Sequence, residues 1–405
     1  MTLDFVQTLA FAGVVLFAGY GLKRLVPVLS RHNIPAPVVG GLPVAALLAV
    51  AYARGAQPLV FDTLLQAPMQ NTFFASVGFG ASVILLRRGG PLVLVMLVLA
   101  SVTALLQNLL GALTATALGQ HPLMGVLAGS VTLTGGPATG LAFAPLFEQA
   151  GVAGASTLAV SAAMIGIVAG GLLGGPIGTY LVAGRPRRPA EAAFAGTLAN
   201  LAEPRFAEPV SQAPPDADVE AYGLSKHLVL MMVAVGVGAW VSAGIASLGV
   251  TLPAYIGAMI IAALIRNLDD ATGVFALSQK TIDDIGEVAL ALFLVMALMT
   301  LRLWELAGVV GPLLIILAVQ VVLIALLCLF VVPRLMGQDY DAAVMSGGFC
   351  GFMLGTTANA VANMGALVER YGPAPKAYLV VPLVGAFGID FINGLLITAA
   401  LNVWR

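Results

Sequence analysis

The stretch from residue 121 to residue 149 reads HPLMGVLAGSVTLTGGPATGLAFAPLFEQ, which is unlike a plain apolar helix. It is dense in Gly, Ser, Thr and Pro, while long apolar runs flank it on both sides. A second stretch of this kind, rich in Gly, Thr and Asn, covers residues 340–368. Helix-breaking, polar backbone at membrane depth persists only where it is buried in protein or lines a watery cavity. Both stretches therefore predict hairpins that enter and leave a membrane on the same side.

The composition of the chain is typical of an integral membrane protein. Of its 405 residues, 60% are hydrophobic and 9% are charged, and the mean hydropathy is +1.01. A soluble domain carries about 25% charged residues. Apolar runs that are long enough to cross a bilayer recur along the chain, so we predict an all-α fold with about ten spans, surrounded by membrane lipid. The predicted spans are residues 5–22, 35–53, 72–86, 91–118, 156–182, 226–248, 253–265, 285–301, 309–332 and 377–401.

The sequence argues against several classes of function. The net charge is −1 and no basic cluster lies beside aromatic residues, which excludes a nucleic-acid partner. The two cysteines, Cys328 and Cys350, lie in apolar sequence and form neither a disulfide framework nor a metal-ligand cluster. The chain has no HExxH motif, no pair of intramembrane acids and no phosphate-binding loop, so we expect no enzymatic activity.

The chain divides into two halves joined by one long polar segment. We predict a first repeat in residues 1–184, a cytoplasmic linker in residues 185–225 and a second repeat in residues 226–405. With five spans in each half and the N-terminus outside, nearly all of the 18 Lys and Arg residues fall in loops on the inner side. Positive charge collects on the cytoplasmic side of membrane spans. This pattern predicts that the N- and C-termini are both periplasmic.

Short motifs recur in the two halves in the same order. The segment Ile-Pro-Ala-Pro at residues 34–37 matches Leu-Pro-Ala-Tyr at residues 252–255. Residues 134–139 of the first hairpin correspond to residues 355–360 of the second. Because each half has an odd number of spans, the two halves lie inverted relative to each other in the membrane, as in many secondary transporters. The repeat therefore predicts a transporter, and duplication without transport is the alternative.

The two predicted hairpins carry the residues expected to form the transport site. Broken helices offer free N–H groups and a positive dipole end to a carboxylate. Unwound carbonyls and the oxygens of Ser, Thr and Asn suit a hard cation such as sodium. The residues predicted to bind the substrate are Thr134, Gly135, Gly136, Pro137, Thr139, Thr356, Thr357, Asn359 and Asn363. The residues predicted to bind sodium are Ser130, Thr132, Asn363, Asp390 and Asn393.

A structural interpretation of the same residues remains open. Small residues allow helices to pack closely, and Ser and Thr hydroxyls bond back to the backbone. Ser346 in the second hairpin is subject to the same two interpretations. Asp390 is the one acid placed well inside a predicted span, and an ionisable residue there is a functional hypothesis. It can hold sodium together with Asn393, carry a proton, or cap a neighbouring hairpin.

Four glycines in the fifth predicted span follow one another at intervals of four residues. Residues three or four apart lie on the same face of a helix. A face without side chains lets another helix approach closely. We therefore assign a packing role, and no chemistry, to Gly166, Gly170, Gly174 and Gly178.

The chain resembles the bacterial sodium/glutamate symporter family. The resemblance covers nearly the entire chain outside the linker. It is carried by residues 34–41, 134–136, 252–259, 265–268, 360–373, 376–377 and 380–390. The resemblance implies sodium-coupled uptake of glutamate across the bacterial inner membrane, with sodium as the coupling ion. It also implies a homodimer, two inverted five-span repeats with hairpins, and an elevator-like motion.

The first hairpin departs from the family pattern. The family reads Gly-Gly-His-Gly-Thr where residues 135–139 read Gly-Gly-Pro-Ala-Thr. The second hairpin has Thr-Ala-Asn at residues 357–359 where Thr-Pro-Thr is expected. These changes alter a hydrogen-bonding group and the freedom of the backbone, so a related small anion remains an alternative to glutamate. The region around Asn363 and Asp390 is intact, which favours sodium.

Two other modes of transport remain as rivals. A channel needs a continuous pore, often in a symmetric ring of subunits, whereas pseudo-symmetry within one chain favours alternating access. A proton-coupled transporter of another organic anion is a nearer rival than a channel, because Asp390 alone is able to carry the proton.

Overall fold

The computed structural model describes residues 2–31, 34–55, 59–84, 90–183, 217–247, 253–306 and 308–404 of this all-helical protein. The first half contains α1 (Phe5–Leu25), α2 (Pro27–Arg31), α3 (Ala36–Ala53), α4 (Gln66–Phe79), α6 (Gly90–Ala117), α7 (Pro122–Val126), η1 (Leu127–Val131), α8 (Gly136–Gln149) and α9 (Ala155–Ala183). The second half contains α11 (Ala217–Ala246), α12 (Ala254–Thr272), α13 (Gln279–Met299), η2 (Leu303–Leu306), α14 (Val310–Leu326), η3 (Leu327–Val331), α15 (Val332–Leu335), α16 (Tyr340–Leu354), α17 (Thr357–Tyr371), α18 (Pro375–Leu383), η4 (Val384–Gly388) and α19 (Ile389–Val403). The strands β1 (Thr2–Leu3) and β2 (Val60–Phe61) form one short parallel pair.

Six helices in the described part of the chain are long and apolar enough to cross a membrane. They are α1, α3, α6, α9, α11 and the continuous segment α14 to α15. The remaining predicted spans are covered by α4, α12, α13 and the segment from α18 to α19. These helices do not meet the same criteria of length and composition. The protein is therefore a helical, multi-pass membrane protein.

Four helices differ from their expected bounds by six or more residues at one end or both, namely α4, α11, α12 and α13, and the linker is only partly described. We predicted a span at residues 72–86, whereas α4 covers Gln66–Phe79. Its first turn is polar and so does not stand out by hydropathy. The predicted linker, residues 185–225, lies outside the described residues up to residue 216, and its last residues belong to α11.

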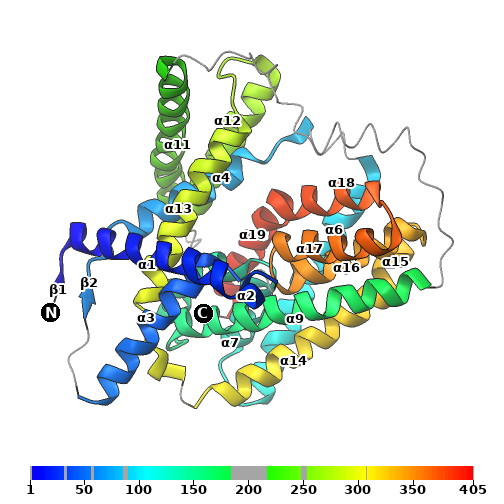
Figure 1. Cartoon of the computed structure of the whole chain (residues 1–405), viewed down its shortest axis with the longest axis horizontal. Helices are drawn as coiled ribbons and strands as arrows, with labels where there is room; N and C mark the ends of the chain where they lie inside the picture. Colours follow the sequence, from blue (N-terminus) through cyan, green and yellow to red (C-terminus); the bar gives the residue numbers. More distant parts are fainter. Residues whose placement is uncertain are drawn as a thin grey trace.

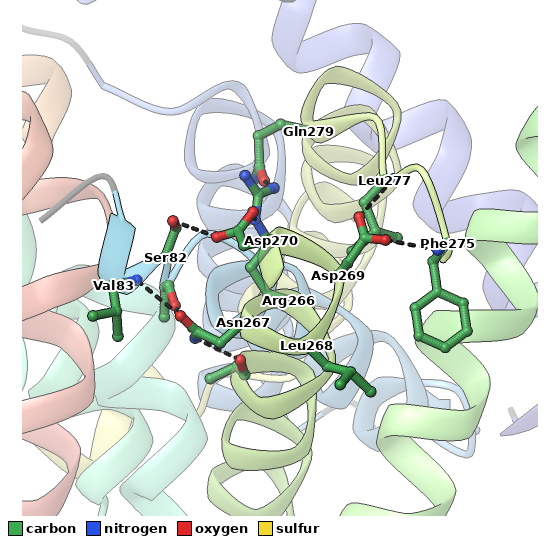
Figure 2. A network of polar contacts seen from close by, with 12 residues as sticks. Ser82, Val83, Arg266, Asn267, Leu268, Asp269, Asp270, Phe275, Leu277 and Gln279 are labelled. Atoms are coloured by element: carbon green, nitrogen blue, oxygen red, sulfur yellow. Dashed lines mark hydrogen bonds and ion pairs between the residues drawn. The ribbon is translucent and has the colours of Figure 1, made fainter. Parts of the chain in front are cut away.

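A polar network fixes the end of α4 against α12 (Figure 2). Asn267 of α12 donates to the carbonyl of Ala81 at 2.7 Å and accepts from the backbone of Val83 at 2.9 Å. Ser82 donates to Asp270, which also pairs with Arg266 at 2.9 Å. These bonds satisfy backbone groups of the segment that follows α4 and hold that segment against α12.

The helices form two groups, each drawn from both halves of the sequence (Figure 1). In the first group α1 packs on α3, α4 packs on α12 and α13, and α11 packs on α12. In the second group α9 packs on α8, α16 and α17, and α6 packs on η1, α14 and α19. Both predicted hairpins belong to the second group. The first hairpin contacts the first group through α8 and α13.

Apolar side chains fill much of the boundary between the two groups. Ala138 and Leu141 of α8, with Val160 of α9, meet Phe293 and Leu294 of α13 in one buried cluster. A polar cavity of about 410 Å³ opens beside this cluster. It is lined by residues of both groups, including Glu148, Thr157, Thr300, Arg302 and Glu305.

The glycine face of α9 has the packing role expected of it. A methyl carbon placed on Gly166 would lie 2.4 Å from the carbonyl oxygen of Leu354, and one on Gly178 would lie 2.3 Å from Leu367. Gly170 and Gly174 meet the same pair of helices, α16 and α17. At Gly166 and Gly174 the backbone of α16 lies too close for any larger residue, so these glycines let α9 approach the second hairpin.

Candidate functional site

The first hairpin is broken near its middle by its glycines. His121 caps α7, and Pro122 follows in the first turn, where its missing N–H costs nothing. Gly129 has φ −101° and ψ −128°, outside the helical region, and interrupts the helix within η1. Gly136 then adopts φ +68°, a conformation that favours glycine, and starts α8.

The second hairpin is broken at a matching place. Asp339 caps α16 by accepting from the backbone of Ala342 at 2.9 Å. The helix ends at Gly355, and Thr356 caps α17 by accepting from the backbone of Asn359 at 3.4 Å. Each predicted hairpin segment therefore contains one helix that ends, and another that begins, at a glycine-containing turn, here called its tip.

The tips of the two hairpins lie next to each other. A methyl carbon placed on Gly136 would lie 3.6 Å from the carbonyl oxygen of Gly355 and 3.7 Å from a methyl group of Thr356. The N-terminus of α8 therefore lies beside the N-terminus of α17. Free N–H groups and the positive ends of two helix dipoles converge at this junction.

Hydrogen bonds link the two tips just behind this contact. The Thr134 hydroxyl donates to Oε1 of Gln107 at 2.7 Å, and Nε2 of Gln107 donates to the carbonyl of Met353 at 2.9 Å. Gln107 lies on α6 and is fully buried. It therefore bridges the end of the first hairpin's broken segment to the last turn of α16.

Several predicted substrate residues position the second hairpin instead of leaving polar atoms free. Asn359 donates from Nδ2 to the carbonyl of Ile167 at 2.7 Å. Asn363 donates to the carbonyls of Gly170 and Gly347 at 3.0 and 3.2 Å. These amides tie α17 to α9 and α16, which fixes the orientation of the tip.

Three predicted hydroxyl groups also have backbone partners. Thr357 donates to the carbonyl of Gly385 at 2.9 Å, beside the π-turn that interrupts the last span. Thr132 donates to the carbonyl of Leu127 at 2.8 Å, and Ser346 donates to the carbonyl of Ala342 at 2.8 Å. At Thr132 and Ser346 these contacts match the structural interpretation, in which hydroxyls bond back within their own helix.

Among the predicted sodium residues, the structure brings Ser130 and Asn393 together. Nδ2 of Asn393 donates to the carbonyl of Ser130 at 2.9 Å. Both residues are almost completely buried. Asp390 is half-buried in the first turn of α19, three residues before Asn393. Asn363, by contrast, is held by the carbonyls of α9 and α16.

Sequence reasoning missed three buried polar residues beside the first hairpin, namely Gln107, Asn108 and Gln320. Asn108 accepts from the backbone of Ser130 at 3.1 Å, and Gln320 donates to the carbonyl of Gln107 at 2.7 Å. Each of the three stands in a predicted span that is otherwise almost entirely apolar. A polar residue inside a span is itself a functional signal, and it would have found them.

Broken helices that meet inside a multi-pass helical protein are typical of secondary transporters. The family model of the sodium/glutamate symporter matches residues 1–373. The chain is 38% identical over 398 residues to a sodium/glutamate symporter of Haemophilus influenzae, covering 98% of this chain and 97% of the relative. It is 39% identical over 398 residues to one of Escherichia coli, covering 98% of this chain and 96% of the relative. The chain belongs to the sodium/glutamate symporter family, whose members are transporters and not enzymes.

Proposed function

We propose that this protein is a symporter that uses sodium to drive the uptake of glutamate, or of a closely related small anion. The observation that carries the proposal is the convergence of two helix N-termini at the hairpin tips, where Gly136 meets Gly355 and Thr356. One helix N-terminus binds one carboxylate well. Two facing N-termini suit a substrate with two carboxylates, and glutamate is such a substrate. The relatives carry sodium and glutamate in their names, which agrees with this chemistry.

In this proposal the predicted substrate residues divide into two roles. Those at the tips surround the anion: Gly136 and Thr356 offer backbone N–H groups, and Thr139 and Thr356 offer hydroxyls. Pro137 adds only apolar contact, and Thr134 and Gly135 hold the turn through backbone N–H groups bonded to the carbonyl of Ser130. Thr357, Asn359 and Asn363 hold the second tip in place through the carbonyls that they bind. The bound sodium ion lies close to Ser130 and Asn393, at the broken segment of the first hairpin.

Transport proceeds by an elevator-like movement of the second helix group along the first. The boundary supports this movement because it is largely an apolar cluster around Leu141 and Phe293. Apolar contacts are non-directional and can re-form after a shift. One polar contact across the boundary, from the Thr157 hydroxyl to the carbonyl of Arg302, is long at 3.4 Å. The polar cavity beside it gives water access to the boundary from one side.

The proposed membrane arrangement follows the two halves of the sequence. The halves are inverted repeats, each with five spans and one re-entrant hairpin, because their helices and broken segments follow the same order. The protein lies in the bacterial inner membrane with both termini in the periplasm. It forms a homodimer, as the resemblance to the family implies. Exposed apolar side chains such as Phe17 of α1 and Trp240 of α11 face lipid or the second copy.

Uptake of labelled glutamate into proteoliposomes tests the proposed function. We expect accumulation when sodium is higher outside than inside, and none in protein-free liposomes. A proton gradient without sodium should drive no accumulation. Accumulation driven by protons alone would contradict sodium coupling and favour Asp390 as a proton carrier. Sodium-independent, non-accumulating flux would indicate a channel.

A further inference from the structure

Buried polar atoms without a hydrogen-bond partner gather around the broken segment of the first hairpin. Within the part of the chain that the structure describes, they are Nδ2 of Asn108, Oγ of Ser130, Oε1 of Gln320 and Oδ1 of Asn393. Each of the four residues is at most 2% exposed. A buried polar atom left without a partner costs about 1–3 kcal/mol. Such a cluster is expected to have a ligand.

Direct contacts join Asn108, Ser130 and Asn393 into one cluster. The backbone N–H of Ser130 donates to Oδ1 of Asn108 at 3.1 Å, and Nδ2 of Asn393 donates to the carbonyl of Ser130 at 2.9 Å. A methyl carbon placed on Gly129 would lie 2.9 Å from the carbonyl oxygen of Gln107 and 3.3 Å from Oδ1 of Asn108.

A fourth element, α14, also contributes a residue to this cluster. Nε2 of Gln320 donates at 2.7 Å to the carbonyl oxygen of Gln107, which faces Gly129. The amide oxygen of Gln320 is left without a partner among the described residues. The cluster is therefore built by α6 and η1 from the first half, and by α14 and α19 from the second.

The chemistry of the cluster selects a hard cation of low charge. Its three unpaired acceptors are neutral oxygens, from Ser130, Gln320 and Asn393. No sulfur or imidazole is among them, which disfavours the softer transition metals. Calcium sites rely on several carboxylates, whereas the nearest acid along α19 is Asp390, one turn before Asn393. A broken helix adds carbonyl oxygens, which coordinate sodium in other transporters.

We infer that the break at Gly129 holds a sodium ion through Oγ of Ser130 and Oδ1 of Asn393. Gln320 supplies a further oxygen from α14. Asn108 is a positioning residue, because it holds the backbone of Ser130 where its hydroxyl faces the ion. This inference rests on the proposed function, since it takes sodium as the coupling ion.

The location explains how the ion can control the substrate site. The carbonyl of Ser130 accepts from Asn393, and also from the backbone of Thr134 at 3.2 Å and of Gly135 at 3.0 Å. These last two residues lead directly to the tip at Gly136. An ion that fixes Ser130 therefore orders the turn that carries the tip, so sodium binding should precede tight binding of the anion.

Sodium binding to the purified full-length protein in lipid nanodiscs tests this site without relying on transport. Calorimetric titration with sodium chloride, at constant ionic strength set by choline chloride, gives the affinity of the native protein. We expect saturable binding, and a loss of affinity of about tenfold or more in Ser130→Ala. The change removes only a hydroxyl without a partner in the described structure. Ser101→Ala is the matched control, because its hydroxyl donates to the carbonyl of Leu97 on α6, and we expect it to bind sodium as the native protein does.

A second variant keeps the test decisive if Ser130→Ala does not fold. Ser130→Cys preserves the size of the side chain but offers sulfur, a poor ligand for sodium, so it should show the same loss. Native-like sodium affinity in either folded variant, or no sodium binding to the native protein, would overturn the inference and leave a buried water as the occupant. Sodium binding with the expected loss, in a protein that accumulates no glutamate, would support the site and contradict the proposed function.

Discussion

Gly136 and Gly355 belong to opposite halves of the chain, yet a methyl carbon on the first would lie 3.6 Å from the carbonyl oxygen of the second. Gly136 also has a φ of +68°. A side chain in that left-handed conformation costs about 1–2 kcal/mol. The junction of the two hairpins thus depends on a glycine for its backbone conformation.

Replacing Gly136 should affect substrate binding as well as folding. We expect Gly136→Ala to lose about 1–2 kcal/mol of stability and to raise the KM for the transported anion, because the methyl group enters the space between the tips. Gly119→Ala is the control, since Gly119 has a φ of +71° and nothing lies within 4 Å of an added methyl carbon. Uptake kinetics and thermal unfolding measure both effects. An equal KM in the two variants would place the substrate elsewhere.

Two adjacent glycines of α9 give a sharp test of helix packing. A methyl carbon on Gly174 would lie 2.0 Å from Nδ2 of Asn363, whereas nothing lies within 4 Å of one on Gly175. Overpacking costs about 1–3 kcal/mol, so Gly174→Ala should lower the unfolding temperature. Gly175→Ala should be neutral or stabilising by about 0.5–1 kcal/mol, because alanine is the better helix former. The same unfolding temperature for both variants would contradict the close contact of α9 with α17.

The network at the end of α12 should contribute strongly to stability. The side chains of Arg266 and Asp270 are only 6% and 16% exposed. Removing one partner of a buried pair costs about 3–5 kcal/mol, so Arg266→Ala should destabilise the protein severely. Arg302→Ala is the comparison, because Arg302 is 68% exposed in its pair with Glu305 and an exposed pair contributes about 0–1 kcal/mol. Chemical unfolding in mild detergent measures the difference, and similar losses in both variants would refute it.

The first tip offers a test of specificity. Pro137 has no backbone N–H to donate to an anion, and Ala138 has less backbone freedom than glycine. If these two residues restrict the recognition of glutamate, Pro137→His combined with Ala138→Gly should raise the rate of glutamate uptake at low substrate concentration. Uptake by proteoliposomes with equal amounts of protein measures the effect. An unchanged rate would show that other residues determine specificity.

Hydropathy and helix-breaking residues predicted most of the helical order. The expected spans at residues 91–118 and 156–182 match α6 (Gly90–Ala117) and α9 (Ala155–Ala183). The expected first hairpin, residues 121–149, contains α7, η1 and α8. These features depend on local composition, which a sequence displays directly. The contact between β1 and β2 was not predicted, because strands of two residues carry no periodic pattern.

The candidate site was predicted only in part, because its contacts depend on pairings between distant segments. The sequence predicted that Ser130 and Asn393 belong to one site, and the structure brings them into contact. The use of Asn363 as a bridge to α9 was not foreseen, because the sequence does not show which amides already have partners. Asn108 and Gln320 were missed because they lie outside the two hairpins, in spans whose contact with the first hairpin the sequence does not show.

The central claim is that glutamate binds where the two tips meet, with sodium bound beside it. A thiol at the tip tests this directly. Ala358 is exposed in the first turn of α17, next to the junction, and the native cysteines are both buried. Ala358→Cys should be alkylated by a maleimide, and Ala366→Cys, exposed further along the same helix, serves as the control. We expect glutamate to slow alkylation at residue 358 only when sodium is present, and to leave residue 366 unaffected. If glutamate and sodium leave the alkylation rate at residue 358 unchanged, in protein that accumulates glutamate, the account is contradicted.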